Sequence, residues 1–158
     1  MQFMPTELGQ TYDLDWRGKP PHMLEWDIPV WYRFLTKWGF NFEKLYYDCA
    51  VGGQYYSENA LKDKYVKMWS RLNAKRIDAL GESSKTVWII EVSTSPGLRA
   101  IGQLLVYRNL WNEDPKIEKP VIMVLVCSVV EPDFLASAAA LNIKIFVMPG
   151  DDRQTIPV

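Results

Sequence analysis

Histidine and cysteine are scarce in this chain of 158 residues, and their scarcity excludes several kinds of site. The single histidine, His22, lies in the proline-rich segment GKPPHM, so neither a histidine-based zinc site nor a Ser-His-Asp triad can be assembled. We interpret His22 as a surface residue. Cys49 and Cys127 are expected to be free thiols in a reducing cytoplasm, because the N-terminal residues lack the basic start and apolar run of a secretory signal.

Long hydrophobic runs and an overall charge are also absent. The longest apolar stretch, residues 121–130, is about half the length that a membrane-spanning helix requires, so no membrane span is expected. The 18 Lys and Arg residues balance the 19 Asp and Glu residues, which argues against a general nucleic-acid binder. The segment SPGLRAIG has two glycines but neither the dinucleotide-binding nor the P-loop spacing, and so gives little support to a nucleotide fold.

A block of positive charge nevertheless lies between residues 60 and 76. Its single acid is Asp63, and the local charge is +5. The basic residues are Lys62, Lys64, Lys67, Arg71, Lys75 and Arg76. This block could contact the phosphates of a nucleic acid, or it could simply be the solvated face of a helix.

Hydrophobic periodicity predicts one α/β domain spanning residues 1–158, with an extended N-terminal arm at 1–25. The predicted helices are 28–38, 57–74, 96–111 and 131–141, and the predicted strands are 44–51, 75–80, 86–92, 121–130 and 143–148. Asp27 and Ser95 are expected to cap helices, and the strand pair 75–80 and 86–92 to form a hairpin. The strand 121–130 is apolar on both faces, as expected of a central parallel strand. The result is a mixed central sheet flanked by helices.

Most of the aromatic residues are expected in the core. Trp31 and Trp38 recur at helical spacing in the first predicted helix. In the helix at 57–74, Tyr65 and Trp69 fall at or near the same kind of spacing, with the lysines on the outer side. Stacking of exposed aromatic rings on nucleic-acid bases is the alternative use of such residues.

Two carboxylates lie close together in the predicted hairpin. Glu91 ends the apolar strand VWIIEV, and Asp78 lies in the neighbouring strand KRIDAL. Two adjacent carboxylates repel each other, and a divalent cation removes this conflict by accepting oxygen ligands from both. The pair therefore indicates a site for Mg²⁺, or for Mn²⁺, and Asp48 or Glu25 could add an acidic ligand. The alternative is structural, with Asp78 in a strand-end turn and Glu91 paired to a nearby arginine.

The helix predicted after Glu91 carries a polar stripe. At 100° per residue, Arg99, Gln103 and Tyr107 fall on one side of the helix, and Ile101, Leu104 and Leu105 fall on the other. The stripe begins near the end of the strand that carries Glu91. A pair of carboxylates and a polar helix face are thereby predicted to share one site.

The strand of Asp78, the triplet 91–93 and the spacing of Gln103 and Tyr107 resemble the PD-(D/E)XK nuclease superfamily. The order of elements over residues 28–148 is similar to that superfamily's restriction-endonuclease-like αβββαβ core, with the helix of the basic block inserted. The resemblance implies a metal-dependent nuclease that hydrolyses phosphodiester bonds in nucleic acid, with DNA as the expected substrate. It implies metal binding by Asp78, Glu91 and the backbone carbonyl of Val92, and a catalytic cleft that Gln103 and Tyr107 line.

Ser93 departs from the family's pattern, which has a lysine at this position. A serine hydroxyl can donate a hydrogen bond to phosphate but supplies no charge. Arg99 is the expected substitute, because its guanidinium fork suits phosphate oxygens. Alternatively, Arg99 only bridges to Glu91.

Three functions remain open from the sequence. The first is the nuclease, in which the basic block contacts the nucleic-acid backbone. The second is a catalytically inactive nuclease-like fold that serves as a nucleic-acid-binding or assembly module. The third is a small-molecule-binding α/β protein. A homodimer could form through the segment LLVYRNLW or the aromatic arm.

Overall fold

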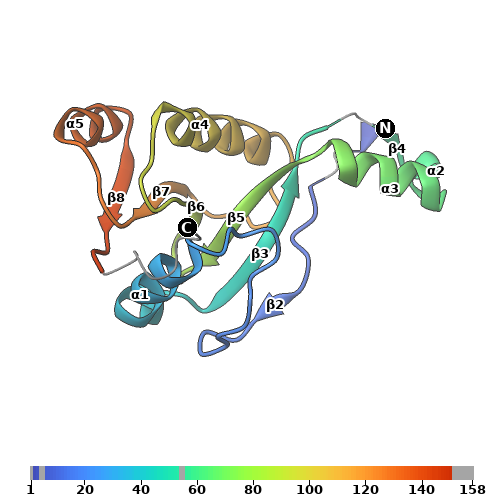
Figure 1. Cartoon of the computed structure of the whole chain (residues 1–158). Helices are drawn as coiled ribbons and strands as arrows, with labels where there is room; N and C mark the ends of the chain where they lie inside the picture. Colours follow the sequence, from blue (N-terminus) through green and yellow to red (C-terminus); the bar gives the residue numbers. More distant parts are fainter. Residues whose placement is uncertain (1, 4–5, 54–55, 151–158) are drawn as a thin grey trace.

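The computed structural model describes residues 2–3, 6–53 and 56–150 (Figure 1). The helices are α1 (Ile28–Trp38), η1 (Gly39–Asn41), α2 (Glu58–Leu61), α3 (Lys64–Asn73), α4 (Leu98–Glu113) and α5 (Pro132–Ala140). The strands are β1 (Gln2–Phe3), β2 (Thr11–Tyr12), β3 (Lys44–Val51), β4 (Tyr56–Ser57), β5 (Lys75–Glu82), β6 (Val87–Val92), β7 (Val121–Cys127) and β8 (Ile143–Val147).

A mixed sheet of six strands forms the centre of the fold, in the order β2-β3-β5-β6-β7-β8. Strands β3, β5 and β6 pair antiparallel, which confirms the predicted hairpin of β5 and β6. Strand β7 pairs parallel to β6 and β8, as the two-sided apolar pattern predicted. The α/β class with a mixed sheet flanked by helices is therefore confirmed. The N-terminal segment contributes β2, which pairs with β3, and a bridge between Glu7 and Ala50.

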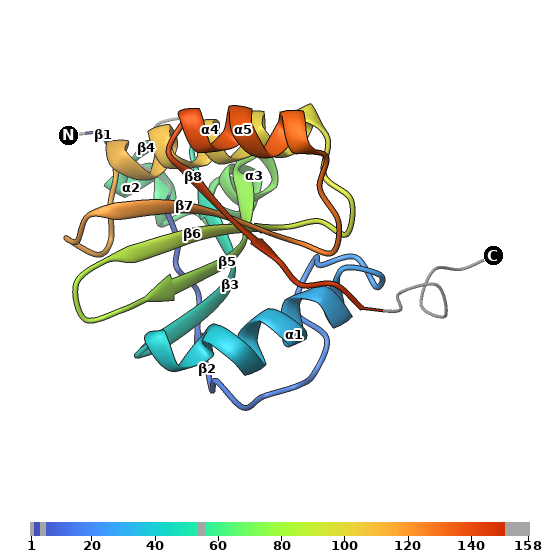
Figure 2. The ribbon, with the colours of Figure 1, turned by 90° about the vertical axis from the view of Figure 1, so that its left-hand side faces the viewer.

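Helices cover both faces of the sheet (Figure 2). Helix α1 lies on one face, where its buried residues join a core with the inward side chains of β3, β6 and β7: Val30, Trp31, Phe34, Leu35, Leu45, Tyr47, Ile90 and Val124. Helices α4 and α5 lie on the other face, over a second core that includes Leu80, Ile89, Leu104, Trp111 and Leu125. Alternate residues of β6 face opposite cores, so Glu91 faces the same side as Val87 and Ile89, toward α4.

Two helix predictions need correction. The predicted helix at 57–74 is two helices, because Ser57 caps α2 and the Asp63 carboxylate accepts a hydrogen bond from the Tyr65 amide at 2.8 Å to cap α3. The helix expected from residue 96 begins at Leu98, with Gly97 rather than Ser95 at the N-cap. The other predicted elements lie within a few residues of their observed bounds, and strand β5 continues through Gly81 to Glu82.

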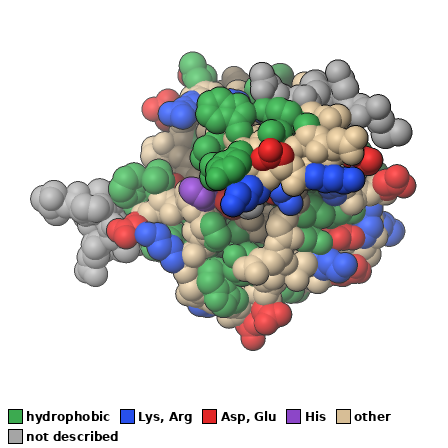
Figure 3. Space-filling model, turned by 90° about the vertical axis from the view of Figure 1, so that its right-hand side faces the viewer, with side chains coloured by type: hydrophobic (Ala, Val, Ile, Leu, Met, Phe, Trp, Pro, Cys, Tyr) green, Lys and Arg blue, Asp and Glu red, His purple; other side chains and the backbone are tan. Residues whose placement is uncertain are grey.

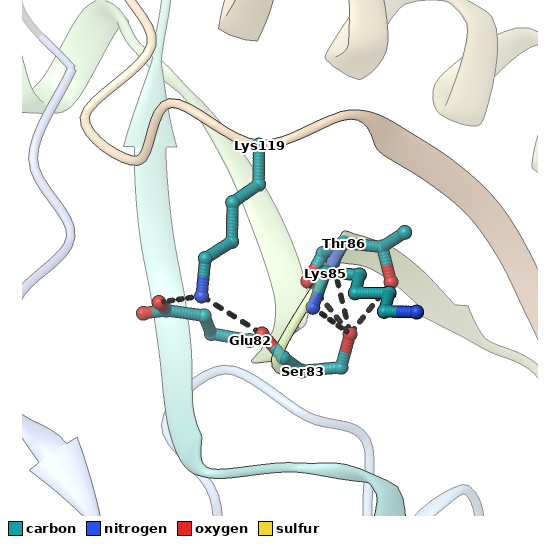
Figure 4. Close-up of polar contacts among 5 residues, drawn as sticks. All are labelled: Glu82, Ser83, Lys85, Thr86 and Lys119. Atoms are coloured by element: carbon teal, nitrogen blue, oxygen red, sulfur yellow. Dashed lines mark hydrogen bonds and ion pairs between the residues drawn. The ribbon is translucent and has the colours of Figure 1, made fainter.

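A partly buried lysine holds the turn between β5 and β6 (Figure 4). Lys119, from the segment before β7, donates to Glu82 Oε2 at 2.7 Å and to the Ser83 carbonyl at 2.9 Å. Inside the turn, the Ser83 hydroxyl accepts from the Thr86 amide at 3.0 Å. These contacts tie the hairpin to the strand that follows α4, and so hold β5 and β6 in register at the end opposite Glu91.

Both cysteines are free, as predicted, and both are buried. Burial raises the pKa of the Cys127 thiol to about 11, which disfavours a reactive thiolate. Among the helices described, none is long and apolar enough to cross a membrane.

Candidate functional site

Three carboxylates form a row across the middle of the sheet. The β5–β6 register pairs Ala79 with Ile90, and its next step places Asp78 opposite Glu91. The β3–β5 register pairs Tyr47 with Ala79 and Cys49 with Ile77, and Asp48 and Asp78 lie between these two pairs, where the ladder is interrupted. Directly opposite residues in antiparallel strands have Cβ atoms about 5 Å apart. We call Asp48, Asp78 and Glu91 the carboxylate row.

The Asp78 and Glu91 carboxyls are poorly solvated. Asp78 Oδ2 accepts a hydrogen bond from the Val92 amide at 3.0 Å. Glu91 is only 8% exposed, and its Oε2 has no hydrogen-bond partner among the described residues. Burial raises the pKa of Glu91, and the charge of Asp78 raises it further. Burial also raises the pKa of Asp78, so without a bound cation the pair favours keeping a proton.

A cavity of about 400 Å³ opens beside this pair, at the carboxyl end of β6. We call it the carboxylate cavity; its lining includes His22, Asp27, Asp78, Glu91, Val92, Ser93, Gly97, Arg99 and Gln103. Most of the residues predicted for the site are therefore brought together. No lysine is among the described residues that line it.

Helix α4 supplies the polar wall of the cavity. Arg99 is exposed there, and its charge lowers the pKa of Glu91, yet no ion pair within 4 Å joins the two in the described part of the chain. The alternative in which Arg99 only bridges to Glu91 is therefore wrong for this structure. Gln103 Nε2 donates to the Tyr107 hydroxyl at 3.4 Å. Tyr107 is buried behind Gln103 rather than on the cavity wall, and burial raises the pKa of its hydroxyl.

Asp27 is a cavity residue that the sequence did not reveal. Its carboxylate accepts hydrogen bonds from the Thr94 amide at 2.8 Å and the Thr94 hydroxyl at 2.9 Å, instead of capping α1 as predicted. The Thr94 hydroxyl also contacts the Trp26 carbonyl at 3.0 Å. The loop after Glu91 is thereby attached to the start of α1. Because the contact joins residues 67 apart in the chain, no local sequence pattern predicts it.

His22 is exposed, as predicted, but it also lines the carboxylate cavity. Its Nε2 lies 3.4 Å from Asp48 Oδ2, and an Arg76 guanidinium nitrogen lies 3.6 Å from the same oxygen. Asp48 Oδ1 is buried with no hydrogen-bond partner in the described residues. His22 and Asp48 both have left-handed backbone angles, with φ of 60° and 57°. Such conformations are uncommon outside glycine and often occur at functional sites.

The basic residues predicted to contact nucleic acid are spread over α2, α3 and the start of β5. Lys62, Lys64, Lys67 and Lys75 are exposed, whereas Arg76 is partly buried beside Asp48. The side chain of Arg71 lies outside the described residues. Helix α3 itself differs from the prediction: Tyr65 and Trp69 are 67% and 57% exposed, so they do not belong to the core.

A metal ion would find two converging carboxylates here. No group of three or more His, Cys, Asp or Glu side chains is placed to hold a metal ion in residues 2–3, 6–53 and 56–150. The unpartnered Oε2 of Glu91 nevertheless leaves a buried carboxylate oxygen that requires a proton or a cation. Two carboxylates suit Mg²⁺, which is bound in many proteins by one or two carboxylates and keeps several waters.

Comparison of this chain with protein-family models, with curated proteins and with solved structures found no match.

Proposed function

We propose that this chain is a metal-dependent nuclease domain of the PD-(D/E)XK type that acts on DNA. The observation that carries the proposal is the unpartnered Glu91 Oε2, which is buried beside Asp78 in an open cavity. A carboxylate in that position is unfavourable unless it is protonated or binds a cation. The Val92 amide donates to Asp78, whereas Glu91 Oε2 has no donor among the described residues.

The order of elements supports the same proposal. Helix α1, strands β3, β5 and β6, helix α4 and strand β7 follow the αβββαβ order of a restriction-endonuclease-like core. Helices α2 and α3 are an insertion between the first two of these strands, and α5 with β8 extends the sheet at its parallel edge. The carboxylate pair lies where the chain passes from the last antiparallel strand to α4.

In this proposal Asp78 and Glu91 bind Mg²⁺ or Mn²⁺, with the Val92 carbonyl as a further ligand. The bound ion would polarise a phosphoryl oxygen and acidify a water molecule. The pKa values of both carboxyls are raised, so the pair must release its proton as the ion binds. Cleavage is therefore expected to increase as the pH rises above the range in which the pair holds that proton.

Arg99 and Gln103 provide contacts for the substrate. Arg99 is exposed on the cavity wall and not held by Glu91, so its guanidinium is available for two oxygens of the scissile phosphate. Gln103 can donate to a third oxygen while Tyr107 orients its amide. Ser93 adds a hydroxyl and no charge.

Purified protein should be incubated with labelled duplex, single-stranded and four-way-junction DNA and with RNA, in Mg²⁺, Mn²⁺ or EDTA. We expect metal-dependent cleavage that Asp78→Asn and Glu91→Gln abolish. Glu118→Gln is the matched control, because this exposed glutamate lies in the segment before β7, away from the cavity. Cleavage that continues in EDTA, or in both cavity variants, would show that the proposed site is wrong.

A second candidate function is a nuclease-like fold without catalysis, which binds nucleic acid or assembles with other proteins. It is favoured by Ser93 and by the absence of lysine from the described cavity lining. Ser93→Lys tests it directly. If the wild-type protein binds DNA without cutting it and Ser93→Lys restores metal-dependent cutting, the serine is the reason for inactivity.

A further inference from the structure

Helix α3 presents its large apolar side chains to solvent. Tyr65, Met68, Trp69 and Leu72 are spaced as one face of the helix and are between 55% and 71% exposed; we call them the α3 outer face. The side of α3 that packs against the protein carries Ser70, which is only 2% exposed. The sequence therefore forms an amphipathic helix whose apolar side is left uncovered by the described residues. Exposed apolar patches of this kind commonly mark an interaction site.

Positive charge surrounds the α3 outer face. Lys64 Nζ lies 5.2 Å from the centre of the Tyr65 ring, and two further lysines are exposed, Lys62 in the turn before α3 and Lys67 in α3. The acid of this segment, Asp63, is engaged in capping α3. Figure 3 views the side of the molecule that carries α3 and shows hydrophobic side chains gathered beside Lys and Arg side chains.

We propose that the α3 outer face binds the unpaired bases of a single-stranded nucleic-acid segment, a proposal that rests on the proposed nuclease function. Aromatic rings stack on bases while nearby cations contact the phosphates, and this combination is typical of proteins that bind single strands. The cores of protein–protein interfaces are instead depleted of lysine. The charge around Tyr65 and Trp69 therefore favours a polyanion over a second copy of this chain.

A continuous surface leads from α3 to the carboxylate cavity. A hollow of about 380 Å³ is lined by Lys64, Lys67, Met68, Leu72, Arg76, Asp48 and His22. His22 also lines the carboxylate cavity, so the two openings share a wall. Along β5, Asp78 lies three residues beyond Lys75, a rise of about 10 Å. A strand bound on α3 can therefore continue into the cavity, so the preferred substrate would carry unpaired bases next to the cleaved bond.

Binding can be measured separately from cleavage. The full-length Glu91→Gln protein in EDTA should be titrated into a fluorescein-labelled thymidine oligonucleotide and into a duplex of equal length, with fluorescence anisotropy as the readout. We expect the single strand to bind more tightly. Adding Trp69→Ala should weaken single-strand binding about tenfold, because loss of one stacked base contact costs about 1–3 kcal/mol, and should leave duplex binding nearly unchanged.

Phe40→Ala is the matched control, since Phe40 is an aromatic residue in η1 that is 78% exposed and lies outside the α3 outer face. It should bind both nucleic acids like the parent protein. The proposal is overturned if Trp69→Ala binds the single strand as the parent does, or if the duplex binds more tightly. A Trp69→Ala variant that binds normally but sediments as a smaller species would assign the α3 outer face to self-association instead. If the binding pattern is as expected but the wild-type protein shows no metal-dependent cleavage, only the nuclease proposal is rejected.

Discussion

Replacing Glu91 by glutamine should stabilise the folded protein when no metal is present. Glutamine keeps the shape of the side chain and removes a charge that is buried beside Asp78. Burial and the neighbouring charge raise the folded-state pKa of Glu91, so the folded protein binds more protons than the unfolded chain above about pH 4. Stability contributed by this carboxyl is therefore lost as the pH rises from there to the raised pKa.

The size of the effect follows from the register of β5 and β6. Opposed carboxylates whose Cβ atoms are about 5 Å apart repel by roughly 3 kcal/mol at an effective dielectric constant of about 20. Holding a proton on Glu91 instead costs about 4 kcal/mol at about pH 7, if the unfolded side chain titrates at about 4.3. Whether Glu91 is charged or protonated, the folded wild-type protein is destabilised by a similar amount. Glu91→Gln should therefore raise the free energy of unfolding by roughly 3 kcal/mol at neutral pH.

Urea denaturation followed by tryptophan fluorescence measures this difference, in EDTA, at neutral pH and at about pH 4. The gain should nearly vanish at the acidic pH, where the carboxyl is protonated in the folded state and mostly protonated in the unfolded chain. Mg²⁺ should stabilise the wild-type protein and not the variant, because it binds only the folded wild-type site. A Glu91→Gln protein that is less stable than wild type at neutral pH, or a difference independent of pH, would refute the reasoning.

Three further substitutions probe the frame around the site. Asp27→Ala removes two hydrogen bonds from Thr94 and should lower the free energy of unfolding by about 2 kcal/mol. Asp27→Asn keeps an acceptor oxygen and should lower it less. Equal losses in the two variants would contradict this account. Gly81→Ala would place a Cβ 2.5 Å from the Phe42 ring, and this clash should lower the free energy of unfolding by about 2 kcal/mol. Calorimetry can check the loss, and adding Phe42→Leu should partly restore stability because it removes the ring. Lys119→Met should cost about 1 kcal/mol in urea denaturation, since it removes the charged donor from the β5–β6 turn; an unchanged midpoint would contradict it.

Local sequence patterns predicted the strands and the carboxylate pair. The apolar run of β6 predicted a carboxylate at the end of a buried strand, and the hairpin with β5 predicted Asp78 on the neighbouring strand. The hairpin was predictable because its two strands are separated by only four residues. The polar stripe of α4 was likewise encoded in the helical period.

Other parts of the site depend on contacts that a local pattern does not contain. The attachment of Asp27 to Thr94 joins distant segments, and His22 reaches the cavity only because the arm passes along β3. The periodicity of α3 revealed an apolar face but could not tell whether another element covers it, so Trp69 was wrongly assigned to the core. A hydrophobic pattern predicts which side chains share a face of a helix. Only the tertiary structure shows whether that face is covered by another element or exposed to solvent.

The charges around the carboxylate cavity suggest an order of binding. Asp27, Asp78 and Glu91 line a space into which an anionic phosphate cannot move favourably. Arg99 lies at its wall, but one guanidinium does not balance three carboxyls. A divalent cation would have to neutralise the pair of Asp78 and Glu91 before a phosphate could approach. The positive charge near α3 would meanwhile hold the nucleic acid beside an otherwise repulsive site. In the proposed nuclease, strand binding on α3 and metal binding at Glu91 are therefore separate steps, and cleavage requires both.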